Sequence, residues 1–201
     1  MKRVPDITPM VNQLLEAAAK EYGEQHFERA VVKVESALAL ARREGVRSVS
    51  LLQTQAHYLA AAKQYEASFE LICDAATIDP VNPNVCDRFI ELSRRLRAML
   101  EEASRGEPSE TVPRLYTMLS TVGETDTSSH LALARHHCAK GDFAAAVTLV
   151  DAVTRLQPAV SEAWALRATL AERMGDLEGS KRFSMRSAEA RTQLSTPQTH
   201  A

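Results

Sequence analysis

Apolar residues recur every three or four positions along most of the chain, which is the period of an amphipathic helix. The first such stretch carries Val11, Leu14, Leu15 and Ala18. Polar breaks interrupt the pattern at short intervals, so it predicts about ten short helices. Their expected ranges are about 9–22, 27–45, 48–62, 65–79, 83–104, 110–122, 128–140, 143–156, 161–174 and 177–191.

Proline marks several of the expected helix ends. Thr8 is expected to cap the first helix ahead of Pro9, and Asn82 to cap the fifth ahead of Pro83, because proline suits the first helical position. Pro113 is expected in the first turn of the sixth helix, where its missing N–H has no intrahelical partner to lose.

Two stretches separated by 34 residues share one pattern. Gly141-Asp142-Phe143 is followed by Ala146, and Gly175-Asp176-Leu177 is followed by Ser180. A period of this length indicates a repeated helical hairpin, in which small residues mark the closest contacts between helices.

These hairpins resemble tetratricopeptide repeats. Motif residues of that family occur in four of the five expected hairpins, and the segment 82–126 matches poorly. They are Leu14, Ala18, Phe27, Ala30 and Ala37; Leu52, Ala56, Leu59, Tyr65, Ala75 and Pro80; Leu133, Ala134, Gly141, Asp142, Phe143, Ala146 and Pro158; and Trp164, Ala168, Gly175 and Asp176.

The resemblance implies an all-α fold, a right-handed solenoid of about five antiparallel hairpins. A single domain is expected over 9–191, with flexible ends at 1–8 and 192–201. The expected hairpins are about 9–45, 48–80, 82–123, 127–158 and 160–191. Trp164 is expected to be largely buried beside Val150 or Val153, because the large residue of the first helix fills the gap between hairpins in this family.

In the resembled family, the first helix of each hairpin lines a concave groove that holds a partner. The corresponding positions here are Asn12, Leu15, Ala19, Tyr22, Gln53, His57, Ala60, Leu131, Arg135, Cys138, Glu162, Thr169 and Arg173. Members that clamp a terminal carboxylate use Lys, Asn and Arg there. Only Asn12, Arg135 and Arg173 are of those types, spread over three hairpins, so a carboxylate clamp is not expected.

Composition and charge exclude several classes of function. The net charge of -2 gives no electrostatic footprint for nucleic acid, and no apolar run is long enough for membrane insertion. The three cysteines, Cys73, Cys86 and Cys138, form no CxxC pair and are expected to be free thiols. Residues 1–9 lack the apolar core of a secretory signal, so a cytoplasmic location is expected.

One cluster contains residue types that bind metals: His130, His136, His137 and Cys138. On a helix only His130 and His137 share a face, and zinc needs four converging ligands. The sequence also lacks a glycine-rich phosphate loop. We therefore expect no enzyme, no cofactor and no metal, and a metalloprotein or enzyme using His130, His137 and Cys138 remains the weakest alternative.

Arginines gather in the segment 82–126, as Arg88, Arg94, Arg95 and Arg97, but acidic residues alternate with them. Ion pairs along a surface helix are the simpler interpretation, and a patch for an anionic partner is the alternative.

Together these features favour a non-catalytic scaffold or adaptor that binds a peptide or helix of a protein partner in its groove. The alternative is a small bacterial tetratricopeptide chaperone of a secretion or assembly system.

Overall fold

The computed structural model describes residues 7–195, with side chains to residue 192, and this part of the chain consists of helices without strands. The all-α prediction of ten helices is therefore confirmed. The helices are α1 Thr8–Gly23, α2 Phe27–Arg43, α3 Val49–Ala61, α4 Tyr65–Ile78, α5 Pro83–Ala103, α6 Thr111–Thr121, α7 Thr127–Lys140, α8 Phe143–Leu156, α9 Ser161–Arg173 and α10 Leu177–Ser195. No helix within residues 7–195 is both long enough and apolar enough to cross a membrane.

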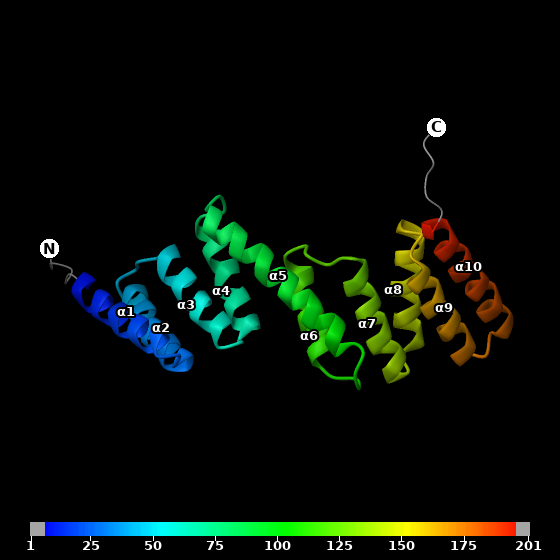
Figure 1. Cartoon of the computed structure of the whole chain (residues 1–201), viewed down its shortest axis with the longest axis horizontal. Coiled ribbons are helices and arrows are strands. Elements are labelled where there is room, and N and C mark those ends of the chain that lie inside the picture. Colours follow the sequence, from blue (N-terminus) through cyan, green and yellow to red (C-terminus); the bar gives the residue numbers. More distant parts are fainter. Residues whose placement is uncertain (1–6, 196–201) are drawn as a thin grey trace. The chain divides into compact units, whose positions relative to one another are not determined.

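The helices form two compact units, residues 1–96 and 97–201, and the boundary falls within α5. In each unit, helices that follow one another along the chain pack side by side, as Figure 1 shows for α1 to α4 and for α7 to α10. Repeated helical hairpins, as expected from the tetratricopeptide resemblance, are therefore present in both units. The single domain over 9–191 stays a prediction.

Small residues are buried between the helices of the first unit. Ala18 of α1 and Ala30 and Val34 of α2 are fully buried and pack with Tyr58 of α3. Because alanine adds little bulk, the backbones of α1 and α2 can approach closely. Ser68 takes the corresponding place in α4, and its buried hydroxyl donates a 2.7 Å hydrogen bond to the Ala56 carbonyl of α3.

The core of the second unit joins α7, α8 and α9. Its buried residues are Leu131, Ala134, Cys138, Ala146, Val150, Val153, Ala163 and Leu170. Trp164 was expected to be largely buried beside Val150 or Val153, and that location is wrong. Trp164 is partly buried, but its ring stacks on Phe183 of α10 at 6.1 Å, while its indole N–H donates to the Pro158 carbonyl at 2.8 Å. The neighbouring Ala163 occupies the contact with α8 instead.

Four hairpins turn through one shared corner. Two positions before the second helix, Gln25, Lys63, Gly141 and Gly175 all have a left-handed backbone, with φ of +62°, +61°, +82° and +84°. In each case the next N–H donates to the carbonyl five residues earlier at 2.8–2.9 Å. This is the Schellman closure, which satisfies carbonyls at a helix end and favours glycine.

Side-chain caps set several helix starts. Ser48 accepts from the Leu51 N–H and Asp142 from the Ala145 N–H. Asn82 accepts from the N–H groups of Asn84 and Val85, which confirms the expected start of α5. Thr8 is the first residue of α1 rather than its cap, so that expectation is off by one residue.

Candidate functional site

Aromatic rings connect the first helices of the first two hairpins. Tyr22, at the end of α1, stacks on Tyr58 of α3 at 4.6 Å and meets the edge of Phe27 at 5.3 Å. The centroid of the His57 ring lies 5.2 Å from that of Tyr22. Burial, followed by the nearby Tyr22, raises the pKa of Tyr58, so its hydroxyl stays neutral. Packed rings lose little further freedom on binding, so they form a rigid wall.

His57 is linked in turn to α5. Its Nδ1 lies 3.1 Å from Nη2 of Arg88, and Nη1 of Arg88 donates to Glu91 at 2.8 Å. A guanidinium can only donate, so Nδ1 of His57 must accept, which requires the neutral imidazole. Burial lowers the pKa of His57 and the Arg88 charge lowers it further, against the opposing effect of Glu91.

A hollow of about 480 Å³, which we call the α3–α5 hollow, opens beside this link. Gln53 Nε2 donates to Asn82 Oδ1 at 3.5 Å and joins the two helices again. The hollow is lined by Gln53, Thr54, His57, Tyr58, Ile72, Asn84, Asp87, Arg88 and Glu91. Amides, carboxylates and a guanidinium are among these residues, so the surface offers both hydrogen-bond donors and acceptors.

The predicted groove residues of the first unit lie in three settings. Gln53 and His57 line the α3–α5 hollow. Leu15 and Tyr22 are half-buried and pack on the core, so part of their surface is already occupied. The remaining three, which are exposed or half-buried on α1 and α3, are Asn12, Ala19 and Ala60.

Two predicted groove residues of the second unit require correction. Leu131 and Cys138 are 1% and 5% exposed and belong to the core between α7, α8 and α9, so neither can touch a partner. The residue pattern of α7 hid this, because the helix is apolar on more than one face. It buries residues from Ser129 to Ala134 almost without interruption.

The other predicted residues of the second unit are held by neighbours. Arg135 donates to Glu162 of α9 and, at 3.3 Å, to the Ser104 hydroxyl. Arg173 donates to the Cys138 carbonyl at 3.3 Å. The Thr169 hydroxyl donates within its own helix. Thus α7 and α9 lie next to each other, and their polar side chains connect them.

The potential metal ligands of α7 do not converge. His130 bonds the Asp126 carbonyl at 2.7 Å, His137 lies 3.2 Å from Asp142, and Cys138 is in the core. The metal alternative for these three residues is therefore wrong. Within the described residues, one group of three potential metal ligands lies close together, at a largely exposed corner. It consists of Glu21, Glu24 and His26.

The sequence analysis placed only Gln53 and His57 of this hollow in a binding groove, and the lining residues that it did not place there include Asn84, Asp87, Arg88 and Glu91. All four lie on α5, whose segment matched the repeat poorly. Their spacing of i, i+3, i+4 and i+7 places them on one helical face. The spacing and the correctly expected start at Asn82-Pro83 indicate that these residues share a face of α5, but they do not indicate that this face meets α3.

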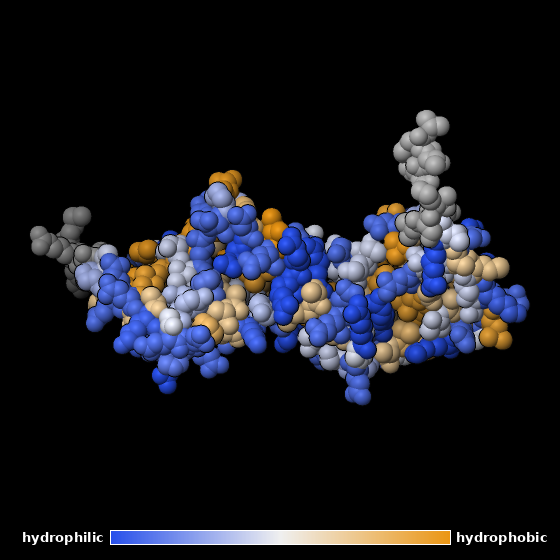
Figure 2. All heavy atoms as spheres, in the orientation of Figure 1, coloured by the Kyte–Doolittle hydropathy of each residue, from blue (hydrophilic) through white to orange (hydrophobic). Residues whose placement is uncertain are grey.

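The interpretation of the arginines as ion pairs along a surface helix holds for Arg88, which pairs with Glu91 of α5. Arg97 pairs at 3.2 Å with Glu124, which lies beyond α6. Arg95 instead lies over the Tyr65 ring at 4.8 Å. Figure 2 shows hydrophilic side chains over most of the visible face and hydrophobic ones in small separate patches.

Comparisons with known proteins add the following. Neither protein-family models nor curated proteins give a match. Solved structures of MamA are similar: MamA of MSR-1 has 14% identity and a TM-score of 0.46, covering 94% of this chain and 99% of that one. MamA from residue 41 to its end, from Desulfovibrio magneticus RS-1, has 11% identity and a TM-score of 0.46, with 92% and 97% covered. Similarity at this level does not establish a shared function.

Proposed function

We propose that the chain is a non-catalytic protein-interaction module that binds a peptide segment or a helix of one partner protein. The observation that carries the proposal is the α3–α5 hollow beside the Tyr22–Tyr58 stack. An aromatic wall supplies contact area that is already rigid, and the polar lining supplies orientation.

The lining suits a polypeptide because peptide groups both donate and accept hydrogen bonds. Gln53 and Asn84 present amides, Asp87 and Glu91 present acceptors, and Arg88 presents donors. An adaptor therefore fits the lining better than a chaperone that shields an apolar segment, since the latter needs a mainly apolar surface.

A catalytic role is not supported by the same residues. The imidazole of His57 is hydrogen-bonded to Arg88, and the Thr54 hydroxyl donates to the Ser50 carbonyl at 2.9 Å. As far as the structure describes the chain, the hollow brings no serine or cysteine next to a histidine. A serine or cysteine activated by a neighbouring histidine is one common arrangement for nucleophilic catalysis.

Within the second unit, we propose a separate binding surface formed by residues that keep exposed or half-buried positions on α7 and α9, namely Arg135, Glu162, Thr169 and Arg173. We also propose a cytoplasmic location, a protein partner, and no binding of nucleic acid. All three cysteines are free thiols, which fits a reducing compartment.

The test is site-specific photo-crosslinking in cells. A benzophenone amino acid replaces Asn84, which lines the hollow, and in a matched protein it replaces Lys33, an exposed residue of α2 outside it. The Asn84 probe is expected to cross-link one protein that the Lys33 probe does not, and mass spectrometry identifies it.

The captured protein is then used in a binding assay. Asn84→Ala combined with Asp87→Ala is expected to weaken its binding at least about tenfold, the usual effect of losing central contacts. Lys33→Ala combined with Glu35→Ala is the control and should bind unchanged. Unchanged binding by the first pair, or equal cross-linking from both probes, contradicts the proposal.

A further inference from the structure

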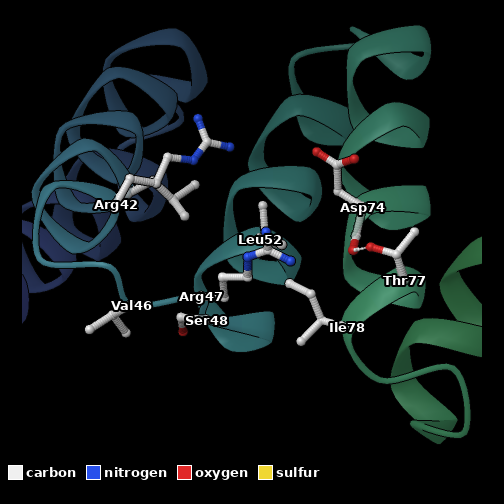
Figure 3. Close-up of a pocket in the computed structure, with 9 residues that line it drawn as sticks. Arg42, Val46, Arg47, Ser48, Leu52, Asp74, Thr77 and Ile78 are labelled. Carbon is white, nitrogen blue, oxygen red and sulfur yellow. Dashed lines mark hydrogen bonds between the residues drawn. The ribbon is translucent and has the colours of Figure 1, made fainter.

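A second hollow lies where the ends of α2, α3 and α4 meet, on helix surfaces that the α3–α5 hollow does not use. Its volume is about 470 Å³. Figure 3 shows Arg42 and Arg47 extending into it from one side, Asp74 and Thr77 on the α4 side, and Leu52 between them. The lining residues are Leu38, Arg42, Val46, Arg47, Ser48, Leu52, Asp74, Thr77 and Ile78.

The two guanidiniums of this hollow are unpaired. Within residues 7–195, neither Arg42 nor Arg47 has an ion pair, a hydrogen bond from its side chain or a ring contact. Other arginines differ; Arg167, for example, donates to Asp151 at 2.8 Å. Asp74 is the one acidic residue in the lining, so the hollow carries a net positive charge beside apolar walls.

The backbone around these arginines is firmly held. The Val46 N–H donates to the Ala41 carbonyl at 2.9 Å, closing α2 around Gly45, whose φ is +72°. Ser48 then caps α3. On the opposite side, the Thr77 hydroxyl donates to the Asp74 carbonyl at 2.7 Å. The hollow is therefore formed before any ligand arrives, which lowers the entropic cost of binding.

We propose that this hollow binds an acidic, apolar segment of a partner protein. A Glu or Asp carboxylate of the segment pairs with Arg42 and Arg47, because a guanidinium fork matches a carboxylate and the lining leaves one positive charge unbalanced. An adjacent aliphatic side chain of the segment packs against Leu52, Val46 and Ile78. The negative charge of Asp74 repels a multiply charged phosphate more strongly than a carboxylate, so the lining favours a single carboxylate.

The inference does not depend on the proposed function of the α3–α5 hollow. The probe is a fluorescent hexapeptide of alternating Leu and Glu, blocked at both ends so that it has no terminal carboxylate, and its binding is followed by fluorescence anisotropy. Arg42→Ala and Arg47→Ala are each expected to weaken binding about tenfold, as for the loss of a charge-assisted contact. Replacing Glu by Gln in the probe should have a similar effect.

Arg43→Ala is the matched control, because Arg43 is an exposed arginine of the same helix turn that does not line the hollow. It should bind the probe unchanged, as should the pair Asn84→Ala and Asp87→Ala. Equal losses in all three arginine variants would mean general charge attraction and overturn the proposal. Absence of binding to the unmodified protein, or displacement of the peptide by inorganic phosphate, would overturn it as well.

Discussion

The link between His57 and Arg88 makes one side chain of the α3–α5 hollow sensitive to acid. The neutral imidazole accepts from the guanidinium at 3.1 Å. Protonation removes the acceptor and places two positive charges side by side. Since burial and Arg88 lower the pKa of His57 in the folded chain, folding disfavours the proton.

This gives a first prediction, on stability against pH. The contribution of neutral His57 is fully present above its unfolded pKa of about 6.5 and is lost as the pH falls through the lower folded value. His57→Gln retains an acceptor that does not titrate. Its unfolding free energy, measured with urea between pH 7.5 and 5, should therefore fall less than that of the unmodified protein. Parallel pH curves would contradict the assignment.

Cys73 provides a second prediction. Burial, with smaller effects of Asp74 and Glu70, raises the pKa of its thiol to about 11. Relative to a thiol of pKa 9.0, the thiolate population falls about a hundredfold, and higher nucleophilicity recovers about tenfold of that. Alkylation of Cys73 by iodoacetamide at pH 8 should thus be about tenfold slower in the folded than in the urea-unfolded protein, as measured by peptide mass spectrometry. Equal rates would show that the thiol is not buried as described.

At the scale of the elements, the residue type at the left-handed position of the shared corner differs between the two units. The same left-handed position holds glycine in the second unit, but Gln25 and Lys63 in the first. A side chain with a β-carbon costs about 1–2 kcal/mol in this conformation. The first unit therefore stores strain at two corners where the second stores none.

Lys63→Gly should accordingly stabilise the protein by about 0.5–1 kcal/mol, because removing strain outweighs the greater freedom of glycine in the unfolded chain. Gln64→Gly is the control one residue later, where φ is −87° and glycine relieves nothing. That variant should lose about 0.5–1 kcal/mol. Urea unfolding measures both, and the same sign for the two variants would refute the argument.

Substituting a buried and an exposed leucine tests how α9 packs. Leu170 is fully buried in the core of the second unit, while Leu156, at the end of α8, is 82% exposed. Leu170→Ala should destabilise by about 2–5 kcal/mol through lost burial and a cavity. Leu156→Ala should stay within about 0.5 kcal/mol of the unmodified protein. Similar losses in urea unfolding would place α9 in a different orientation.

At the scale of the whole molecule, the sequence predicted the helices well because their signals are local. Periodic apolar residues and the Asn82-Pro83 start depend on a few neighbours each. Which face of a helix stays open depends on contacts between helices. Hence Leu131 and Cys138 were assigned to a groove although they are in the core. Trp164 was assigned to the core although it stacks on Phe183.

The same reasoning explains why the α3–α5 hollow was found only in part. Gln53 and His57 follow from the repeat, whereas Arg88 belongs to a segment that departs from it. A family pattern transfers positions only where its motif residues are present, so the sequence did not indicate that Arg88 is the partner of His57.

The departure from the repeat predicts uneven stability along the chain. The connection between α5 and α6 contains Gly106 and Pro108, and units of a repeat protein are held mainly by their neighbours. Amide hydrogen exchange should be faster at residues 105–109 than in α7 and α8. Uniform protection of both regions, measured by mass spectrometry, would contradict this.

The shared corners also affect how the chain folds during its synthesis. Each is closed by an N–H just beyond the helix that is ending and a carbonyl of that helix only five residues earlier. Such a closure needs nothing from later parts of the chain, so it can form as soon as its residues leave the ribosome. A hairpin can then fold while translation continues. Because each repeat contacts only its neighbours, the exposed apolar face of an early hairpin is buried as soon as the next hairpin has been synthesised.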